Sequence, residues 1–525
     1  MLSDLISGVL LAHGERTAVV DRDTTLGYRE LYERSAATAL DLAARGTGSV
    51  VRPAAPDRAA PGTGRPPADG EPPNDDRPRA GIRAANSAAY VVAYLAVLRA
   101  GWVPFLIDRA AGPQETEAIA EDCGLDLLLH DADTPAVPAG GVRHGSVGPL
   151  ALTALPARPD RPPLHPTTEV CRFTSGSTGR PHCIEFSAHA VHRAAQNWVS
   201  GTGLTSADRI ACFASLSNGL AFNTSLLPAF LTGAELHLAA GLPTAGRVVR
   251  MLEQSRATRL VGFPALYESL VRRAPDRAAF RDLRMAISSA APLGPETKER
   301  FTTLTGVPVQ NYFGAAEAGP LTFAPDPLRD PGLGRPLPGV SLRAGTVGTA
   351  APVEVRSESM GTRYLNAPGA LESRTTADGY YRTGDLGYLY DGSLVLTGRT
   401  SQVINVGGRK IDAVEVAEVL RGAAGVRDAV VLEVTDRHGG PALGAVLAAD
   451  PALDPAGPRR HTAERLAAHK VPSLLRVVPE IPRGTTGKPA MAELRRLFDA
   501  PGPRTVVEGP GPTPRSAPEA PKETV

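Results

Sequence analysis

The chain has 525 residues, 42% of them apolar, which is more than one hydrophobic core usually holds and predicts two or more domains. Its 56 Lys and Arg residues balance 55 Asp and Glu residues, which argues against a broad basic surface for nucleic acid or an anionic membrane. No apolar run approaches the roughly 18 residues of a membrane span, and the N-terminus lacks the basic segment of a secretory signal, so we expect a cytoplasmic protein.

The elements expected from the pattern begin with a strand and an amphipathic helix over residues 17–47. Residues 52–79 are dominated by Pro, Gly, Asp and Arg, a composition that predicts a disordered surface insertion. Residues 80–108 then read as strand, helix and strand, the unit of an open parallel sheet. Short apolar strands alternate with helices to about residue 315. The four isolated cysteines, at 123, 171, 183 and 212, are expected to be buried apolar side chains.

The C-terminal part of the chain changes pattern twice. Residues 334–396 are β-rich. After residue 399 the chain reads as a strand over 401–408, a helix over 412–423, strands over 426–434 and 442–450, and a helix over 461–470. We therefore predict an α/β fold with a large N-terminal domain over 1–398, in which parallel-rich sheets with helices are joined by a β-rich subdomain. A small α+β domain over 402–499 and a disordered tail over 500–525 follow.

The most informative motif is the run from Thr174 to Pro181, TSGSTGRP, which follows an apolar strand-like segment. Small and hydroxylated residues leave backbone amides and hydroxyls accessible to phosphate oxygens. The run is not a Walker A motif, because Gly179 is followed by Arg180, Pro181 and His182 instead of Lys and Ser or Thr. An ordinary Ser/Gly turn would explain this run equally well on its own.

Three further motifs carry candidate side chains. In NYFGAAEAG (311–319), an aromatic pair could stack a purine and Glu317 could hold a magnesium ion; a solvated loop acid is the alternative. In YYRTGDLG (380–387), Asp385 could accept hydrogen bonds from both ribose hydroxyls, or it could simply cap a turn. In PRGTTGKPAMAELR (482–495), Lys488 stands on a Gly/Thr loop from which it could enter a site when a domain closes.

Together and in this order, the four motifs resemble the adenylate-forming superfamily of acyl-CoA synthetases, firefly luciferase and peptide-synthetase adenylation domains. The resemblance covers about residues 17–498 and includes TGRTSQVINVGGRKIDAVEVAEVL (397–420), which is similar to the family's hinge and the start of its mobile C-terminal domain. It implies an AMP-forming ligase that converts a carboxylic acid and ATP into acyl-AMP and pyrophosphate with Mg²⁺, and then forms a thioester with CoA. The hinge would lie at 399–401.

The resemblance also implies site residues. The catalytic residues would be Lys488, Glu317 and His182, with Glu317 as the metal ligand. Residues that bind ATP would be Thr174, Ser175, Gly176, Ser177, Thr178, Gly179, Ala290, Ala291, Asn311, Tyr312, Phe313, Gly314, Ala316, Asp385 and Arg399. A thiol route would be lined by Gly407, Gly408 and Lys410. A tight strand bend is the other reading of those two glycines.

Three positions depart from the family's pattern. The phosphate loop is followed by His182 where Lys is usual, so the permanent positive charge of that lysine is missing there. Ala316 replaces the common Thr of the aromatic-Gly-x-Thr-Glu motif, and Ser401 replaces the usual Asp or Lys of the hinge. These departures leave open a catalytically silent binding protein.

The segment 211–236 corresponds to the family's acyl-binding helix and contains no acid before Glu235. A buried α-ammonium group would need a carboxylate partner, so an α-amino acid substrate is not expected. Asn218, Phe222, Gly262, Phe263 and Ser289 would line an apolar site for an aryl or short to medium acyl acid, although the two phenylalanines could equally be core residues. Two alternatives remain open: transfer to a separate carrier protein, and a diazotase-like activation of nitrite for transfer to an amine.

Overall fold

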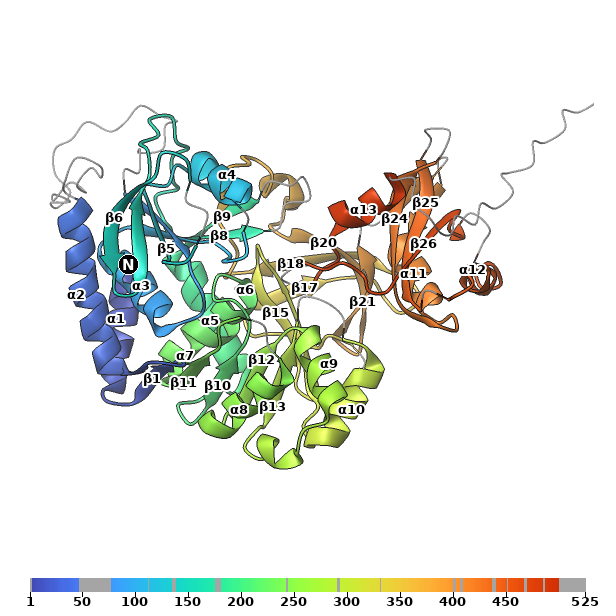
Figure 1. Cartoon of the computed structure of the whole chain (residues 1–525), viewed down its shortest axis with the longest axis horizontal. Helices are drawn as coiled ribbons and strands as arrows, with labels where there is room; N and C mark the ends of the chain where they lie inside the picture. The colour runs from blue at the N-terminus through green and yellow to red at the C-terminus, as the bar shows by residue number, and fades with distance from the viewer. Residues whose placement is uncertain are drawn as a thin grey trace, which may run out of the picture. The chain divides into compact units, whose positions relative to one another are not determined.

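The computed structural model describes residues 2–46, 77–111, 113–134, 138–174, 181–241, 244–289, 293–330, 332–399, 403–406, 409–436, 441–450, 452–466, 470–484 and 487–499. The chain divides into unit 1, residues 1–383 and 387–396, and unit 2, residues 384–386 and 397–525. Figure 1 shows strands and helices mixed throughout unit 1, and the predicted α/β class is confirmed. The predicted tail lies outside the described residues, and the hinge assignment stays a prediction.

The first large sheet of unit 1 has eight strands in the order β19-β9-β8-β4-β3-β5-β7-β6. Its centre is parallel, since β3 pairs in parallel with β4 and β5, and β4 with β8. The strands are β3 (Arg79–Arg83), β4 (Val103–Leu106), β5 (Leu127–Asp131), β6 (Val142–Val147), β7 (Leu150–Ala154), β8 (Thr168–Thr174), β9 (His182–Ser187) and β19 (Arg363–Tyr364).

The second large sheet has nine strands in the order β16-β15-β14-β13-β12-β10-β11-β1-β2. The run from β14 through to β1 is parallel, and an antiparallel strand or hairpin is added at each edge. The strands are β1 (Thr17–Val20), β2 (Thr25–Gly27), β10 (Arg209–Cys212), β11 (Glu235–Leu238), β12 (Arg259–Gly262), β13 (Met285–Ser288), β14 (Val309–Ala315), β15 (Gly319–Ala324) and β16 (Arg335–Pro336).

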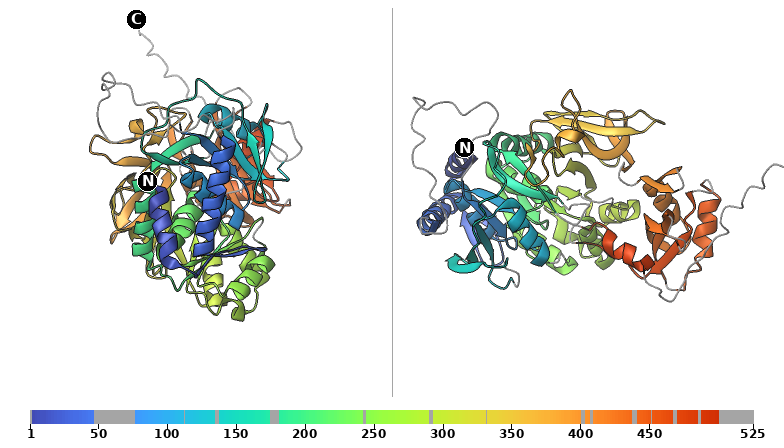
Figure 2. Two further views of the ribbon diagram at one scale, coloured as in Figure 1. Left: turned by 90° about the vertical axis from the view of Figure 1, so that its left-hand side faces the viewer. Right: turned by 90° about the horizontal axis from the view of Figure 1, so that it is seen from above.

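Helices cover both sheets, and α1 and α2 lie side by side at one end of unit 1 (Figure 2). The helices are α1 (Leu2–His13), α2 (Tyr28–Gly46), α3 (Ala88–Arg99), α4 (Pro113–Cys123), α5 (Ala188–Thr202), α6 (Gly219–Ala221), α7 (Leu227–Thr232), α8 (Ala245–Ser255), α9 (Pro264–Arg273) and α10 (Pro295–Thr305). Between α6 and α7 lies one π-helical turn, η1 (Phe222–Leu226), and two 3₁₀ turns are η2 (Arg277–Phe280) and η3 (Glu372–Arg374).

The largest buried cluster lies between the two sheets and draws residues from both. Helix α3 is buried around most of its circumference, which explains why its sequence is apolar at nearly every position instead of on one stripe. A second cluster joins the nine-stranded sheet to α8, α9 and α10, and a third joins the eight-stranded sheet to α4. All four cysteines are buried and free, as expected.

A four-stranded sheet in the order β17-β18-β20-β21 forms the predicted β-rich part: β17 (Val340–Arg343), β18 (Ala351–Ser357), β20 (Tyr381–Tyr390) and β21 (Ser393–Arg399). Unit 2 contains the hairpin β22 (Val403–Val406) and β23 (Arg409–Asp412) and the sheet β24 (Val426–Thr435), β25 (Pro441–Ala449) and β26 (Leu474–Val478). Its helices are α11 (Ala413–Arg421), α12 (Ala456–Ala463) and α13 (Met491–Asp499). Separate apolar clusters cover its three-stranded sheet, one with α11 and one with α13.

Two predicted boundaries are wrong. The helix expected over 461–470 is α12, which begins at Ala456 and ends at Ala463. Asp454 Oδ1 accepts a hydrogen bond from the Ala456 amide at 3.0 Å and Pro455 precedes the first turn, so Asp-Pro is the start signal that the pattern overlooked. The expected insertion over 52–79 overruns β3, because Arg79 is its first residue and donates to the carbonyls of Cys123 and Pro162 at 2.6 and 2.7 Å. The rest of the insertion, to residue 76, lies outside the described residues.

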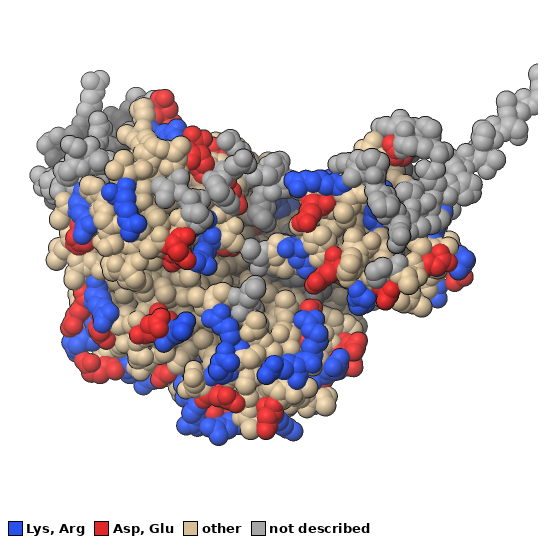
Figure 3. Space-filling model, in the orientation of Figure 1, with Lys and Arg blue, Asp and Glu red and all other residues tan. Residues whose placement is uncertain are grey.

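Charged side chains of both signs share the face of the molecule that Figure 3 shows. Figure 3 shows basic and acidic side chains interspersed over the visible face, in agreement with the net charge of +1. Within the described part of the chain, none of the helices combines the length and the hydropathy that crossing a bilayer requires.

Glu185 provides a test of this packing. Its carboxylate is fully buried and accepts hydrogen bonds from the His165 amide at 2.7 Å, from the Thr168 hydroxyl and from Arg363 Nε at 2.7 Å. Because Glu185→Ala leaves two donors unsatisfied and removes the ion pair of a partly exposed guanidinium, we expect it to lower the free energy of unfolding by roughly 2–4 kcal/mol. Urea titration followed by tryptophan fluorescence measures this, since Trp102 and Trp198 both lie in unit 1.

The matched control is Glu30→Ala, which removes an exposed ion pair with Arg34 on α2. It should cost less than about 0.5 kcal/mol. A Glu185→Ala protein as stable as the control would contradict the importance of the buried carboxylate.

Candidate functional site

The phosphate motif connects two paired strands. Thr174 is the last residue of β8 and His182 the first of β9, and the two are register partners; residues 175–180 lie outside the described part. Asn366 holds the described end of the connection, since its Oδ1 accepts from the Cys183 amide at 2.8 Å and its Nδ2 donates to the Pro181 carbonyl at 2.9 Å. The position of His182 is therefore fixed on both sides by one side chain.

Glu317 lies in the tight turn between β14 and β15. The strands approach closely there: a Cβ on Gly314 would lie 2.5 Å from the Tyr312 hydroxyl and 2.8 Å from the Gly319 carbonyl, so only glycine fits. The Glu317 carboxylate accepts a hydrogen bond from the Tyr364 hydroxyl at 2.6 Å, and Arg374 Nη1 is 3.8 Å from the same oxygen. Its side chain is 13% exposed, so one carboxylate is held in place with part of its surface still accessible.

Tyr364 joins the first two motifs. Its ring packs edge-on against the ring of His182, with centroids 5.3 Å apart, while its hydroxyl binds Glu317. Burial and the negative charge of Glu317 raise the pKa of Tyr364 well above its usual range, so it remains a hydrogen-bond donor at neutral pH. His182 and Glu317, which are distant in the sequence, therefore belong to one cluster.

Glu317 is suited to a magnesium ion that is held mainly by nucleotide phosphates. Mg²⁺ in such sites takes one or two carboxylates, keeps several waters and uses phosphate oxygens for the rest. No group of three or more His, Cys, Asp or Glu side chains arranged for a metal occurs among the described residues. A single accessible carboxylate fits the phosphate-bound case.

The other residues of the second motif have distinct environments. The Asn311 amide is held on both sides, because its Oδ1 accepts from Lys298 Nζ at 2.7 Å and its Nδ2 donates to the Gly332 carbonyl at 2.6 Å. Tyr312 is buried with its ring edge-on to Trp198, 5.1 Å between centroids. Phe313, on the opposite side of the strand, is only partly buried. Of the aromatic pair, Phe313 is therefore the ring better placed to meet a purine.

Several predicted residues meet at the carboxyl ends of the parallel strands. Gly262 ends β12 opposite Ser288 of β13, and Ser288 lies opposite Asn311 of β14, so Phe263 and Ser289 follow neighbouring strand ends. This edge of an open parallel sheet is where ligands bind in α/β folds. Of the same group, Asn218 caps α6 through a hydrogen bond from the Leu220 amide at 2.9 Å, and Phe222 begins the π-helical turn with its ring edge-on to Tyr94, 5.8 Å away.

Arg172 is the strongest feature that the motif analysis missed. It lies on β8 two residues before Thr174, and its side chain is 5% exposed. The guanidinium stacks on Phe186 at 4.2 Å and faces Phe222 at 5.2 Å, and it donates one long hydrogen bond of 3.4 Å to the Ala316 carbonyl. It therefore contacts both the predicted acyl-binding helix and the Glu317 turn.

The contacts of Arg172 stabilise it by less free energy than the burial of its charge costs. No Asp or Glu of the described residues lies within ion-pair distance, and its Nε has no hydrogen-bond partner there. A cation–π contact contributes about 1–2 kcal/mol, and withdrawing a charged group from water costs several kcal/mol. Burial lowers the pKa of Arg172 to about 10, so the group still carries its charge at neutral pH.

Other predicted residues are not brought into this cluster by described contacts. Asp385 is a buried residue of β20 and Lys488 an exposed residue of unit 2, and the division of the chain assigns both to unit 2. The described residues do not include Ser175, Gly176, Ser177, Thr178, Gly179, Ala290, Ala291, Ser401, Gly407 and Gly408, nor the side chains of Arg399 and Lys410. The roles of all these residues stay predictions.

Sequence signals existed for two of the three residues that the motif analysis missed. Arg172 interrupts the apolar strand EVCRFT on the same face as Thr174, and a charge at such a position is unusual. Lys298 is one of only five lysines in an arginine-rich chain. Nothing local marks Tyr364, whose role depends on a contact between distant segments.

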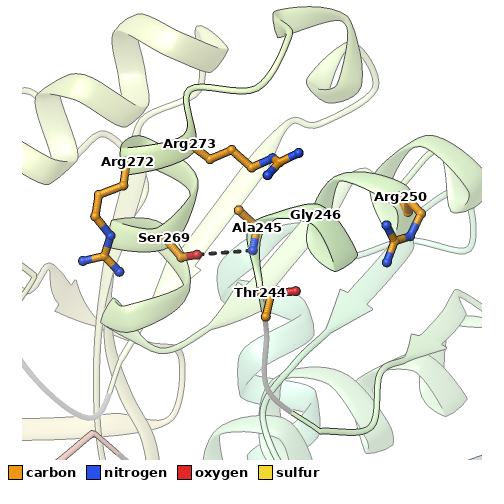
Figure 4. A pocket seen from close by; sticks show the side chains of 7 residues that line it. All are labelled: Thr244, Ala245, Gly246, Arg250, Ser269, Arg272 and Arg273. Atoms are coloured by element: carbon orange, nitrogen blue, oxygen red, sulfur yellow. Dashed lines mark hydrogen bonds between the residues drawn. The ribbon is translucent and has the colours of Figure 1, made fainter.

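A separate depression lies where the start of α8 meets α9 (Figure 4). Ser269 of α9 accepts a hydrogen bond from the Ala245 amide at 3.2 Å across it. None of its lining residues belongs to the motifs: Thr244, Ala245, Gly246, Arg250, Ser269, Arg272 and Arg273. It is therefore not part of the candidate site.

Comparison with known proteins gives consistent results. A family model described as AMP-binding enzyme matches residues 75–365. The anthranilate–CoA ligase of Pseudomonas aeruginosa is 28% identical over 453 residues, which cover 79% of this chain and 86% of that protein. A 3-hydroxybenzoate–CoA/4-hydroxybenzoate–CoA ligase of Thauera aromatica is 25% identical over 545 residues, covering 95% and 97%. The crystal structure of ATP-bound MatB from Rhodopseudomonas palustris has a TM-score of 0.75 at 22% identity, covering 94% and 99%, a likeness of fold.

Tyr364→Phe tests the cluster. It removes the hydrogen bond to the Glu317 carboxylate while keeping the ring against His182, so we expect a loss of about tenfold in kcat/KM for magnesium–ATP with little change in thermal stability. Steady-state kinetics of pyrophosphate release with varied ATP measures it. Tyr390→Phe, at an exposed tyrosine of β20, is the control and should behave as the wild type. Equal kinetics for the two variants would contradict a positioning role of Tyr364.

Proposed function

The chain belongs to the AMP-binding enzyme family, and we propose that it joins a carboxylic acid to coenzyme A in two ATP-dependent steps. The family match spans more than half of the chain and confirms the predicted resemblance to adenylate-forming enzymes. In the first step the acid becomes an acyl-adenylate and pyrophosphate leaves. In the second, the thiol of CoA takes the acyl group and AMP leaves.

The observation that carries the proposal is the cluster of His182, Tyr364 and Glu317 beside the end of β8. It brings the end of the phosphate motif to a single accessible carboxylate, and this is the arrangement that a magnesium–triphosphate needs. Glu317 would hold the ion. Magnesium, when bound, supplies positive charge to the phosphates.

The first step brings two anions together. A carboxylate oxygen attacks the α-phosphorus, the bond from that phosphorus to the bridging oxygen of the β-phosphate breaks, and pyrophosphate carries away the electron pair. Catalysis of such a step is mostly positioning and neutralisation of charge. Thr174 and the loop that follows it would hold the β- and γ-phosphates, Phe313 and Asn311 the adenine, and Asp385 and Arg399 the ribose. Lys488 of unit 2 would bridge the carboxylate and the α-phosphate.

The acceptor in the second step is proposed to be CoA, because the two curated relatives described above are named as CoA ligases. The thiol sulfur attacks the acyl carbonyl and the bond to the AMP oxygen breaks, so that a thioester and AMP are formed. Gly407, Gly408 and Lys410 would line the route of the thiol. A carrier-bound thiol would undergo the same reaction, and the assay below distinguishes the two acceptors.

The acid is proposed to be an aryl or a short to medium acyl acid without an α-ammonium group. Between Asp208 and Glu235 the chain has no carboxylate that could pair with an ammonium ion. The positive charge of Arg172 beside Phe222 would also repel an ammonium group at this position. Both observations argue against α-amino acids.

Lys488→Ala tests the two-step scheme. We expect pyrophosphate release from acid and ATP to fall by a factor of 10² or more, because the cation that meets the developing charge is lost. Thioester formation from pre-formed acyl-adenylate and CoA should stay near the wild-type rate. The control is Arg460→Ala, an exposed cation on α12 of the same unit, which should change neither rate.

The wild-type protein is assayed in parallel with a panel of acids, with and without CoA. Acid-dependent pyrophosphate release together with a CoA thioester supports the proposal. Release without a thioester points to a carrier or an amine acceptor, and no release with any acid overturns the proposed function.

His182→Lys tests the departure at the end of the phosphate loop. A lysine there restores a permanent charge next to Tyr364, and we expect the KM for ATP to fall by about tenfold with the product unchanged. His189→Lys, at an exposed position of α5, is the control and should leave the KM unchanged. Loss of product formation in His182→Lys would instead assign His182 to a specialised chemistry.

A further inference from the structure

We propose that Arg172 is an anion-binding residue of the acid site, and that the acid activated by this chain carries a second negatively charged group, a carboxylate or a sulfonate. The proposal rests on the proposed function, because it names the class of acid which that function would activate. It assigns the second anion to the guanidinium and leaves the first carboxylate to react with ATP.

The position of Arg172 relates it to both parts of the reaction. Arg172 and Thr174 lie on the same face of β8, two residues apart, which is about 6–7 Å along a strand. The guanidinium turns toward η1, where Phe222 lies, and toward the carbonyl of Ala316, next to Glu317. A ligand group bound at Arg172 would therefore lie two residues before Thr174 along β8, and Thr174 is where the phosphate motif begins.

The guanidinium also approaches the backbone of the acyl-binding helix. A Cβ placed on Gly219 would lie 2.9 Å from Arg172 Nη1, so the guanidinium lies close to the backbone at the start of α6. The segment that the sequence predicts to bind the acyl group therefore has a buried cation beside its backbone. An apolar acid alone would leave that cation without a partner.

Arg172 has fewer and longer polar contacts than two other buried arginines, although the Nε of Arg79 also has no partner among the described residues. Arg259 pairs with Asp208 at 3.2 Å, and Arg79 donates to two carbonyls at 2.6 and 2.7 Å. Among the described residues, Arg172 has one hydrogen bond of 3.4 Å, an Nε without an acceptor and no ion pair. Glu317 is the carboxylate whose negative charge acts on Arg172. Glu317 already accepts a hydrogen bond from Tyr364 and lies near Arg374.

A second unsatisfied group lies close to it. The hydroxyl of Tyr94 is fully buried without a hydrogen-bond partner among the described residues, and its ring contacts Phe222. A carboxylate or sulfonate has enough oxygens to accept from a guanidinium edge and from a phenol at once. A neutral or monoanionic acid would leave the buried charge and the hydroxyl unpaired, a state that proteins avoid.

The experiment compares matched acids that differ by one anionic group: butanoate with succinate, and benzoate with isophthalate and with 3-sulfobenzoate. Pyrophosphate release gives kcat/KM for each acid with the wild-type protein, Arg172→Gln and Arg172→Lys. We expect the wild type to prefer the dianionic member of at least one pair by tenfold or more. Arg172→Gln should lose activity on that acid by 100-fold or more and keep its activity on the monoanionic partner.

Arg172→Lys keeps the charge but not the planar fork, so we expect a smaller preference for the dianion that is still present. Arg79→Gln is the matched control, because it makes the same substitution at a buried arginine on the face of the sheet that contacts α4. It should lower stability without changing the ratio between the two acids. If Arg172→Gln does not fold, the change of that ratio in Arg172→Lys carries the test.

Two results would overturn the proposal: a wild-type protein that favours no dianionic acid, and an Arg172→Gln protein that loses both members of each pair by the same factor. Failure of the proposed function has a different signature, namely no pyrophosphate release with any acid. In that case thermal-shift binding of the same acids decides. Stabilisation of the wild type but not of Arg172→Gln by a dianion supports the anion site, and no stabilisation by any dianion overturns it.

Discussion

The hydrogen bond from Tyr364 to Glu317 is the contact on which the candidate site depends. Tyr364 belongs to β19 at the edge of the eight-stranded sheet, and Glu317 to a hairpin turn of the nine-stranded sheet. A large apolar cluster also joins the two sheets, and apolar packing has no direction of its own. A short, charge-assisted hydrogen bond fixes orientation as well as distance, so it determines where the carboxylate points relative to the strand that begins at His182.

The segment around Tyr364 holds the neighbouring residues in place through different chemistry at each position. Arg363 pairs with the buried Glu185, Asn366 bonds on both sides of His182, and the Gly361 amide donates to the Glu317 carbonyl at 2.7 Å. A short, irregular segment with no motif of its own therefore positions the ends of two motifs. The precision of a binding site depends on such supporting contacts as much as on the residues that meet the ligand.

The sequence predicted those parts of the structure that depend on residues close together along the chain. Strands such as β3, β10 and β12 follow from short apolar runs between turn signals. The motif analysis singled out Glu317, whose role stays a prediction. The start of α12 was missed because Asp-Pro was not read as a helix start. Tyr364 could not be predicted, since its partner lies 47 residues away and only the fold brings the two together. Arg172 was visible as a charge in an apolar strand, but its surroundings were not.

The distribution of positive charge along β8 and β9 has a consequence for specificity under the role proposed for Arg172. The family's usual lysine after the phosphate loop is absent at His182, and a permanent cation stands instead at Arg172, deeper on the neighbouring strand. A cation near water is screened, whereas a buried one acts through a low dielectric and is costly to leave unpaired. ATP is common to every reaction of this kind, so a contact with its phosphates does not distinguish one acid from another. A buried guanidinium beside the predicted acyl-binding helix would do so, because each acid would either neutralise it or leave it unpaired.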